Sequence, residues 1–234
     1  MTEATAIGAQ SRLVVAVDGP SGSGKSSTSR AVARRLGLAF LDTGAMYRAM
    51  TWWAMHEGVD LSDQPAVADL VRAATLKIDL DPVRPTIAVN GLDVTTAIRD
   101  PEVSAAVSAI ATNLGVRADL VERQRRLIED AGGVVAEGRD ITTVVAPDAP
   151  VRVLLVADPD ARIARRHAEL GEVVDTEAVT DQVIRRDRDD STVAQFTHAA
   201  PGVTVIDSTF LELDEVVDAI CALVPSQAAR VRRP

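Results

Sequence analysis

A glycine-rich run near the start of the chain has the residue types and the spacing that bind phosphate. It reads Gly19-Pro20-Ser21-Gly22-Ser23-Gly24-Lys25-Ser26-Ser27, follows the apolar run Leu13–Val17 and leads straight into a helical pattern. This is G-x-x-x-x-G-K-S/T in the strand, loop and helix context that gives the pattern its meaning. The glycines let backbone N–H groups converge on one anion, and the helix N-terminus adds unpaired amides. We therefore predict a nucleoside triphosphate site here.

Two side chains of this loop have a predicted chemical role. Lys25 is placed to reach the outer phosphates, and the Ser26 hydroxyl to bind Mg²⁺ together with the nucleotide. Lys25 and Lys77 are the only lysines of the chain, so a lysine at this position is hard to attribute to chance. A plain structural turn before a helix is the alternative, and the glycines, the Lys-Ser pair and the flanking elements together argue against it.

The composition indicates a globular protein whose partners are small molecules. Apolar residues make up 47% and charged residues 25% of the 234 residues, which suits one large domain with a sizeable core. A formal net charge of -9 argues against a nucleic-acid polymer as partner, whereas local arginine clusters suit small phosphorylated ligands. No signal peptide or membrane-spanning run is visible, and the single Cys221 fits a reducing compartment. We expect a cytoplasmic monomer without a membrane partner.

Five apolar runs separated by helical patterns predict the fold. Near-continuous apolar runs are typical of parallel strands that are covered on both faces. Strands that alternate with helices form a doubly wound parallel sheet, so we assign the chain to the α/β class with a P-loop NTPase-type architecture. Ligands of such sheets bind at the carboxyl ends of the strands. The runs are Leu13–Asp18, Leu38–Leu41, Gly133–Ala136, Val151–Val156 and Val203–Ile206.

Polar residues follow two further strands and should face the same crevice as the phosphate loop. Asp42-Thr43-Gly44 leads into a helix that carries Arg48, and Arg139 and Asp140 follow a buried strand. A guanidinium forks onto a phosphate through two parallel hydrogen bonds, which favours a phosphorylated second ligand. Surface salt bridges are the alternative for these arginines. Asp140 either accepts from an exocyclic amine or a ribose hydroxyl, or orients Arg139, and the pattern leaves both open.

Several motifs are similar to those of a known family. Over about Val14 to Val224 the chain resembles the bacterial cytidylate kinases of the P-loop nucleoside monophosphate kinase group. Outside the phosphate loop, Asp42 to Arg48 (Asp-Thr-Gly-Ala-Met-Tyr-Arg) with Gly138-Arg139-Asp140 is a specific match. The resemblance also rests on Thr143 to Pro150 and on Arg186 to Thr192. A β insert is typical of the bacterial members, and Lys77–Leu80 with Thr86–Val89 and the hairpin signal Asn90-Gly91 has that pattern.

The resemblance implies roles for particular residues and a division of the chain. Thr43, Arg48 and Arg139 would hold the monophosphate, and Ser108, Arg117 and Asp140 would read cytosine. Arg186 and Asp190 would bind the sugar, while Arg162, Arg165 and Arg166 would act in catalysis with Lys25 and Arg139. The implied units are a core (13–41, 107–157, 191–225), a monophosphate-binding segment (42–106), an arginine-rich lid (158–190) and tails that are disordered (1–12) or frayed (226–234).

Two positions depart from the family pattern. Val193 follows Asp190-Ser191-Thr192 where the family usually has an arginine, so a cation near the ribose or the phosphate is missing. Thr142 stands where a glycine is usual, which would shift the backbone near Arg139. A weaker activity or a changed sugar preference would follow from these differences.

The function expected from the sequence is transfer of the γ-phosphoryl group from MgATP to CMP or dCMP, giving ADP and CDP or dCDP. Another small-molecule P-loop kinase is the alternative enzyme. A regulatory nucleotide-binding module is the alternative of another class, and the Asn-Lys-x-Asp motif that would read guanine is absent from the sequence.

Overall fold

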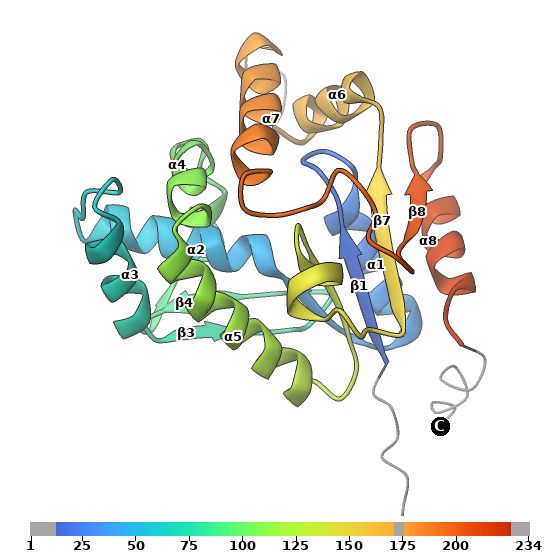
Figure 1. Ribbon diagram of the computed structural model, residues 1–234, viewed down its shortest axis with the longest axis horizontal. Helices are drawn as coiled ribbons and strands as arrows, with labels where there is room; N and C mark the ends of the chain where they lie inside the picture. The colour runs from blue at the N-terminus through green and yellow to red at the C-terminus, as the bar shows by residue number, and fades with distance from the viewer. Residues whose placement is uncertain (1–12, 171–175, 226–234) are drawn as a thin grey trace, which may run out of the picture.

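The computed structural model describes residues 13–170 and 176–225. Its centre is a five-stranded parallel sheet in the order β2-β6-β1-β7-β8. Figure 1 labels β1, β7 and β8 of this sheet. The predicted parallel sheet of an α/β protein is therefore confirmed. The strands are β1 (Val14–Asp18), β2 (Ala39–Asp42), β6 (Val134–Gly138), β7 (Val151–Val156) and β8 (Thr204–Asp207).

The sheet has an apolar core on each face because successive side chains of a strand point to opposite sides. Val15, Val17 and Val135 pack with α1 (Lys25–Leu36) and α8 (Leu213–Ala222) on one face. Ala16 and Ala136 belong to the larger core on the other face, which α2 (Thr43–His56), α3 (Gln64–Ala73), α4 (Pro101–Ala111) and α5 (Leu114–Asp130) complete. Burial on both faces explains why these strands are almost purely apolar.

Side-chain caps fix where the helices that border the functional site begin. Asp42 is the last residue of β2, and its carboxylate accepts a hydrogen bond from the Ala45 amide. The helix α2 therefore starts at Thr43, directly at the edge of the sheet. Asn113 caps α5 in the same way, and Asp100 caps α4, which has a proline in its first turn. A capped helix start satisfies amides that would otherwise lack partners.

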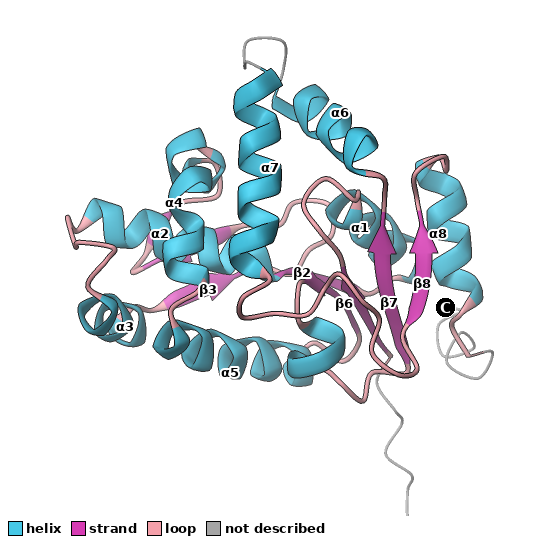
Figure 2. Cartoon of the chain, turned by 45° about the horizontal axis from the view of Figure 1, so that its top comes forward, coloured by secondary structure: helices cyan, strands magenta, loops and turns pink. Residues whose placement is uncertain are grey.

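A separate three-stranded antiparallel sheet forms the predicted β insert. It consists of β3 (Leu76–Ile78), β4 (Ile87–Val89) and β5 (Leu92–Asp93), and the 3₁₀ turn η1 (Ala97–Arg99) follows it. Asn90 and Gly91 join β4 to β5 with positive φ angles of 48° and 86°, the backbone that a two-residue hairpin turn requires. This sheet lies beside α2 and α3, at the opposite end of the molecule from β8 and α8 (Figure 2).

Two helices lie above the carboxyl ends of the central strands (Figure 1). They are α6 (Pro159–Leu170) and α7 (Thr176–Asp190), and they fall within the segment predicted as a lid. The predicted tails (1–12 and 226–234) and residues 171–175 of the predicted lid lie outside the described residues. Within the described part of the chain, no helix has the length and apolar character to cross a membrane.

The segment after β6 is tied to the end of β1. The buried Asp18 carboxylate accepts from the backbone N–H groups of Ile141 and Thr142, both at 2.8 Å, and from the Thr142 hydroxyl at 2.6 Å. Burial raises the pKa of Asp18 to about 6, although these bonds act in the opposite direction. Thr142, the departure from the usual glycine, thus adds a bond that anchors the single π-helical turn η2 (Ile141–Val145) next to Arg139 and Asp140.

Candidate active site

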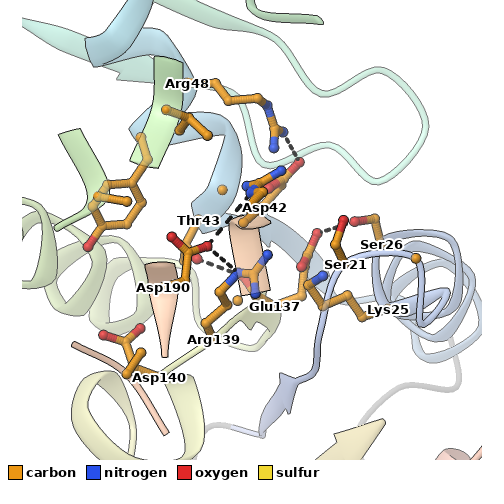
Figure 3. A pocket seen from close by; sticks show the side chains of 18 of the residues that line it. Ser21, Lys25, Ser26, Asp42, Thr43, Arg48, Glu137, Arg139, Asp140 and Asp190 are labelled. Atoms are coloured by element: carbon orange, nitrogen blue, oxygen red, sulfur yellow. Dashed lines mark hydrogen bonds and ion pairs between the residues drawn. The ribbon is translucent and has the colours of Figure 1, made fainter. Parts of the chain in front are cut away.

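One cleft collects most of the predicted site residues at the carboxyl ends of β1, β2 and β6 (Figure 3). Its empty space is about 940 Å³ including the open mouth, enough for a nucleotide. The predicted residues that line it are Ser21, Gly22, Gly24, Lys25, Ser26, Ser27, Thr43, Arg48, Arg117, Arg139, Asp140, Arg166, Arg186 and Asp190.

The phosphate loop has the close backbone packing that its glycines predict. A side chain at Gly19 would place its Cβ 2.3 Å from the Leu155 carbonyl oxygen, so only glycine fits there. Gly22 and Gly24 have φ angles of 75° and 85°, in the left-handed region that favours glycine. The Lys25 ammonium donates to the Pro20 carbonyl at 3.1 Å. Burial lowers the pKa of Lys25 to about 8 despite the opposing effect of Glu137, so the group stays largely charged at pH 7.

Glu137 is a residue of this site to which sequence reasoning gave no role. It is the second-to-last residue of β6, is 2% exposed, and accepts a short hydrogen bond from the Ser26 hydroxyl. Burial and the neighbouring Asp42 raise the pKa of Glu137 to about 7, while Lys25 acts against them. An acidic residue at the end of a buried strand was the available signal, since that edge of the sheet also holds the phosphate loop.

The groups predicted for the monophosphate converge on the same side of the cleft. The Thr43 hydroxyl donates to the Glu137 carbonyl at 2.8 Å, and Arg48 pairs with Asp42 at 3.0 Å. Arg48 and the Ala45 amide hold the pKa of the Asp42 carboxyl below its usual range although burial raises it. Thr43 and Arg48 come from the first turns of α2, so the capped helix start positions them together, whereas Arg139, the third predicted group, follows β6.

Asp140 pairs with Arg117 of α5 through a short hydrogen bond and makes no ion pair with Arg139. The structure thus shows no side-chain bond through which Asp140 would orient Arg139, one of the roles that the pattern left open. Burial raises the pKa of Asp140, and Arg117 counteracts that effect. Ser108 lies on α4 and is not among the residues that line the cleft, and its carbonyl accepts from the Thr112 hydroxyl at 2.8 Å.

The three arginines of α6 differ in their surroundings. Arg162 donates to the Ser21 carbonyl at 3.0 Å, so it touches the phosphate loop, and Arg166 lines the cleft. Arg165 instead donates to the Ser208 hydroxyl at 3.0 Å and to the Ser208 carbonyl. It thereby lines a second cleft on the other side of the phosphate loop, between Gly22–Gly24 and the segment 208–213. The structure therefore does not bring Arg165 to the cleft that Arg166 lines.

Comparison with known proteins identifies the family. A family model described as cytidylate kinase matches residues 15–226. The chain is 57% identical over 216 residues to a cytidylate kinase of Cutibacterium acnes (strain DSM 16379 / KPA171202), which covers 92% of this chain and 97% of the relative. The chain belongs to the cytidylate kinase family. The resemblance seen in the motifs is therefore confirmed.

Further relatives agree with this assignment. A cytidylate kinase of Streptomyces avermitilis (strain ATCC 31267 / DSM 46492 / JCM 5070 / NBRC 14893 / NCIMB 12804 / NRRL 8165 / MA-4680) is 43% identical over 219 residues, covering 93% of this chain and 94% of the relative. Among solved structures, an uncharacterized protein from Eubacterium ventriosum ATCC 27560 covers 92% of this chain and 99% of its own with a TM-score of 0.51. Its sequence identity of 11% makes it a likeness of fold alone.

In this member of the cytidylate kinase family an aromatic ring lies beneath Arg139. Phe196 is fully buried, and its ring centre lies 4.5 Å from the Arg139 guanidinium carbon. Asp190 binds the edge of that guanidinium at 2.8 Å and lies 3.7 Å from Arg186. The segment that lacks the usual arginine at Val193 thus supplies the Phe196 ring and the Asp190 carboxylate that hold Arg139. A second carboxylate, that of Asp187, binds Arg139 as well.

Asp187 of α7 is the second site residue that the sequence did not single out. Its carboxylate accepts from the Ser21 backbone N–H at 3.0 Å, from Arg139 at 2.7 Å and from Arg162 through a short hydrogen bond. Burial raises the pKa of Asp187, but Arg139 and the Ser21 amide outweigh it and leave the pKa below the usual range. A carboxylate held by a phosphate-loop amide and two arginines occupies the surroundings that suit a phosphate group.

We predict that Asp187→Asn binds inorganic tripolyphosphate several-fold more tightly than the unchanged protein. The neutral amide no longer competes for the Ser21 amide and the two arginines, and it no longer repels the incoming anion. Titration calorimetry would measure the affinity, with Asp189→Asn as control because Asp189 pairs with the exposed Arg188 one residue away. Equal affinities of the two variants would contradict this role of Asp187.

Proposed function

We propose that the protein transfers the γ-phosphoryl group of MgATP reversibly to CMP or dCMP, giving ADP and CDP or dCDP. The observation that carries the proposal is that Arg139 and Arg166 line one cleft together with the phosphate loop, while Arg162 donates to the loop carbonyl of Ser21. Phosphoryl transfer needs alignment and neutralised charge more than a nucleophile, because the acceptor oxygen already carries charge. Membership of the cytidylate kinase family supports the choice of acceptor.

The donor would bind across the phosphate loop and extend into the second cleft. Backbone N–H groups of residues 19–27 (apart from Pro20), the α1 N-terminus and Lys25 offer contacts for its phosphates. The second cleft would take the nucleoside end, since it borders Gly22, Ser23 and Gly24 and includes Arg165 and Phe210. The Phe210 side chain is 95% exposed there and offers a face on which a base can stack. Arg165 would thus act on the donor nucleoside rather than on the transferred group.

The acceptor would bind in the first cleft with its phosphate toward Lys25. Thr43, Arg48 and Arg139 are proposed to hold that phosphate, and Arg186 with Asp190 the sugar. The Asp190 Oδ1 atom is buried without a hydrogen-bond partner among the described residues, which leaves it available to a hydroxyl. Arg117 and Asp140 are proposed to read the base, because a carboxylate accepts from the 4-amino group of cytosine and repels the corresponding carbonyl of uracil. Ser108 is proposed to contribute to base recognition together with Arg117 and Asp140, from a position on α4 outside the lining of the cleft.

Ser26 and Glu137 fit a magnesium ion that arrives with the nucleotide. A hydroxyl and a carboxylate are hard oxygen ligands, and their direct hydrogen bond puts both at the phosphate loop. No three His, Cys, Asp or Glu side chains of the described residues form a metal site, so phosphate oxygens would complete the shell. When bound, the ion would offset the negative charge of the donor phosphates. Lys25, Arg162 and Arg166 would add further positive charge around the same phosphates.

We propose that the three segments predicted from the sequence have separate roles. The core (13–41, 107–157, 191–225) would carry the phosphate loop, residues 42–106 would hold the monophosphate, and residues 158–190 would close over the phosphates. Closure would exclude water, since water in the closed site would hydrolyse ATP. We further propose that the protein acts as a monomer in the cytoplasm.

A screen of acceptors tests the function directly. ADP release from MgATP would be followed in a coupled assay with CMP, dCMP, UMP, AMP and small alcohols as acceptors. We expect CMP and dCMP to give the highest kcat/KM values. Highest activity on a small alcohol would favour another P-loop kinase, and no acceptor-stimulated release would favour a regulatory nucleotide-binding module.

We predict that Lys25→Ala lowers kcat by roughly 10²- to 10³-fold, because the variant loses a fixed positive charge at the transferred phosphoryl group. Lys77→Ala is the matched control, since Lys77 is the other lysine of the chain and lies exposed on β3. Steady-state kinetics with saturating CMP and ATP would measure both variants. A Lys25→Ala enzyme as active as Lys77→Ala would refute the role given to the loop lysine.

We predict that Asp140→Ala lowers the preference for CMP over UMP, measured as the ratio of kcat/KM values, by about tenfold or more. The variant leaves Arg117 without the carboxylate that fixes it and removes the group that rejects a carbonyl. Asp148→Ala, a change at an exposed carboxylate of the nearby loop, provides the comparison. An unchanged ratio in Asp140→Ala would rule out base recognition by this residue.

A further inference from the structure

A third hollow lies beside the reaction cleft, and the proposed mechanism gives no role to three of the arginines that line it, Arg30, Arg34 and Arg99. Its empty space is about 1370 Å³ including the open mouth, and it shares Ser26 and Ser27 with the reaction cleft, so the two are continuous. One carboxylate, that of Asp42, is among its described lining residues. The lining arginines are Arg30 and Arg34 from α1, Arg48 from α2, Arg99 from η1, Arg166 from α6 and Arg186 from α7.

Three of these arginines form no ion pair with a described acidic side chain, although Arg99 acts electrostatically on Asp42. Among the described residues, Arg30, Arg34 and Arg99 have no carboxylate oxygen within ion-pair distance. The Arg30 guanidinium lies over the Phe40 ring at 5.4 Å, which fixes its direction without neutralising it. By contrast, Arg35, the neighbour of Arg34 on α1, pairs with Asp218. The hollow thus has six arginines to one carboxylate among its described lining residues, on a chain whose formal net charge is -9.

The arrangement points to phosphate groups as the ligand. Guanidinium groups bind phosphate oxygens in pairs of hydrogen bonds, and several in one hollow with low-dielectric walls focus the field on an anion. A nucleic-acid polymer fits less well because the arginines lie inside a hollow that leads to the phosphate loop, and the protein as a whole is acidic. Nucleotides, which must reach that loop, have the required charge and size.

We propose that Arg30, Arg34 and Arg99 form an accessory phosphate-binding surface that captures the phosphates of incoming nucleotides and passes them to the reaction centre. This inference rests on the proposed function for the identity of the nucleotide, but not for the binding of phosphate. The surface raises the rate at which nucleotides associate with the protein rather than the rate of phosphoryl transfer. Its arginines lie beside the reaction cleft and do not act on the reacting groups. The net negative charge of the protein would otherwise repel anionic substrates.

The test compares two triple variants with the same change in net charge. The surface variant is Arg30→Gln, Arg34→Gln, Arg99→Gln. The control variant is Arg72→Gln, Arg84→Gln, Arg126→Gln, whose side chains are exposed on α3, on the loop after β3 and on α5. Binding of inorganic tripolyphosphate is measured by titration calorimetry at low salt and near physiological salt. The probe has no base and is not turned over by CMP phosphorylation, so its result stands whether or not CMP is the acceptor.

We expect the surface variant to bind tripolyphosphate roughly tenfold more weakly at low salt and to show a shallower salt dependence than the control variant. With CMP and ATP, its kcat/KM values should fall by a similar factor while kcat at saturation stays within about twofold. Equal tripolyphosphate binding by the two triple variants would overturn the proposal, because net charge alone would then account for the effect. An unchanged affinity with a lowered kcat would overturn it as well.

Single variants keep the test decisive if the triple variant does not fold. Arg34 and Arg99 are exposed, so Arg34→Gln and Arg99→Gln remove charge without opening a core, whereas Arg30 contacts Phe40. Each should lower the tripolyphosphate affinity at low salt by about two- to threefold relative to Arg84→Gln. No difference from Arg84→Gln in either variant would contradict the proposal.

Discussion

Positive charge that is packed into a cleft with little solvent has to be offset before any phosphate arrives. In this structure carboxylates supply the offset, with Asp42 on Arg48, Asp140 on Arg117, and Asp187 and Asp190 on Arg139. Burial together with Arg139 and Arg48 lowers the pKa of Arg186 to about 9, which shows how strongly the guanidinium groups act on one another. Removing one member of such a buried pair leaves an uncompensated charge. A phosphate that binds here must therefore replace a carboxylate as the partner of an arginine, so that the arginine keeps an anionic partner throughout.

This constraint explains how distant segments form one site. Asp187 lies on α7, yet its carboxylate joins the phosphate loop, the residue after β6 and the α6 residue Arg162. A phosphoryl group that takes over these partners would keep the same segments together. The helices above the strand ends therefore need no extensive apolar contact with the core to be placed, since the anion at the centre holds their arginines.

The fold and the location of the site could be predicted from the sequence because both depend on local patterns. Apolar runs and the glycine loop identified the five strands and the crevice, and Asn90-Gly91 identified the hairpin of the insert. The hydrogen bonds and ion pairs between distant segments could not be predicted in this way. The bond between Ser21 and Asp187 spans 166 positions, and Asp187 stands among similar acidic and basic residues whose directions only the folded chain decides. The same is true of Arg165, which differs from Arg162 and Arg166 in its direction and not in its type.

The central claim is that donor and acceptor meet through their phosphates at a single cationic centre between two clefts. The most direct measurement is the affinity of a compound that joins cytidine and adenosine through five phosphates, compared by titration calorimetry with the affinities of CMP and ATP. One molecule that fills both clefts avoids the cost of bringing together two, so binding should be at least about 100-fold tighter than that of either nucleotide alone. A joined compound that binds no more tightly than ATP would contradict a shared centre.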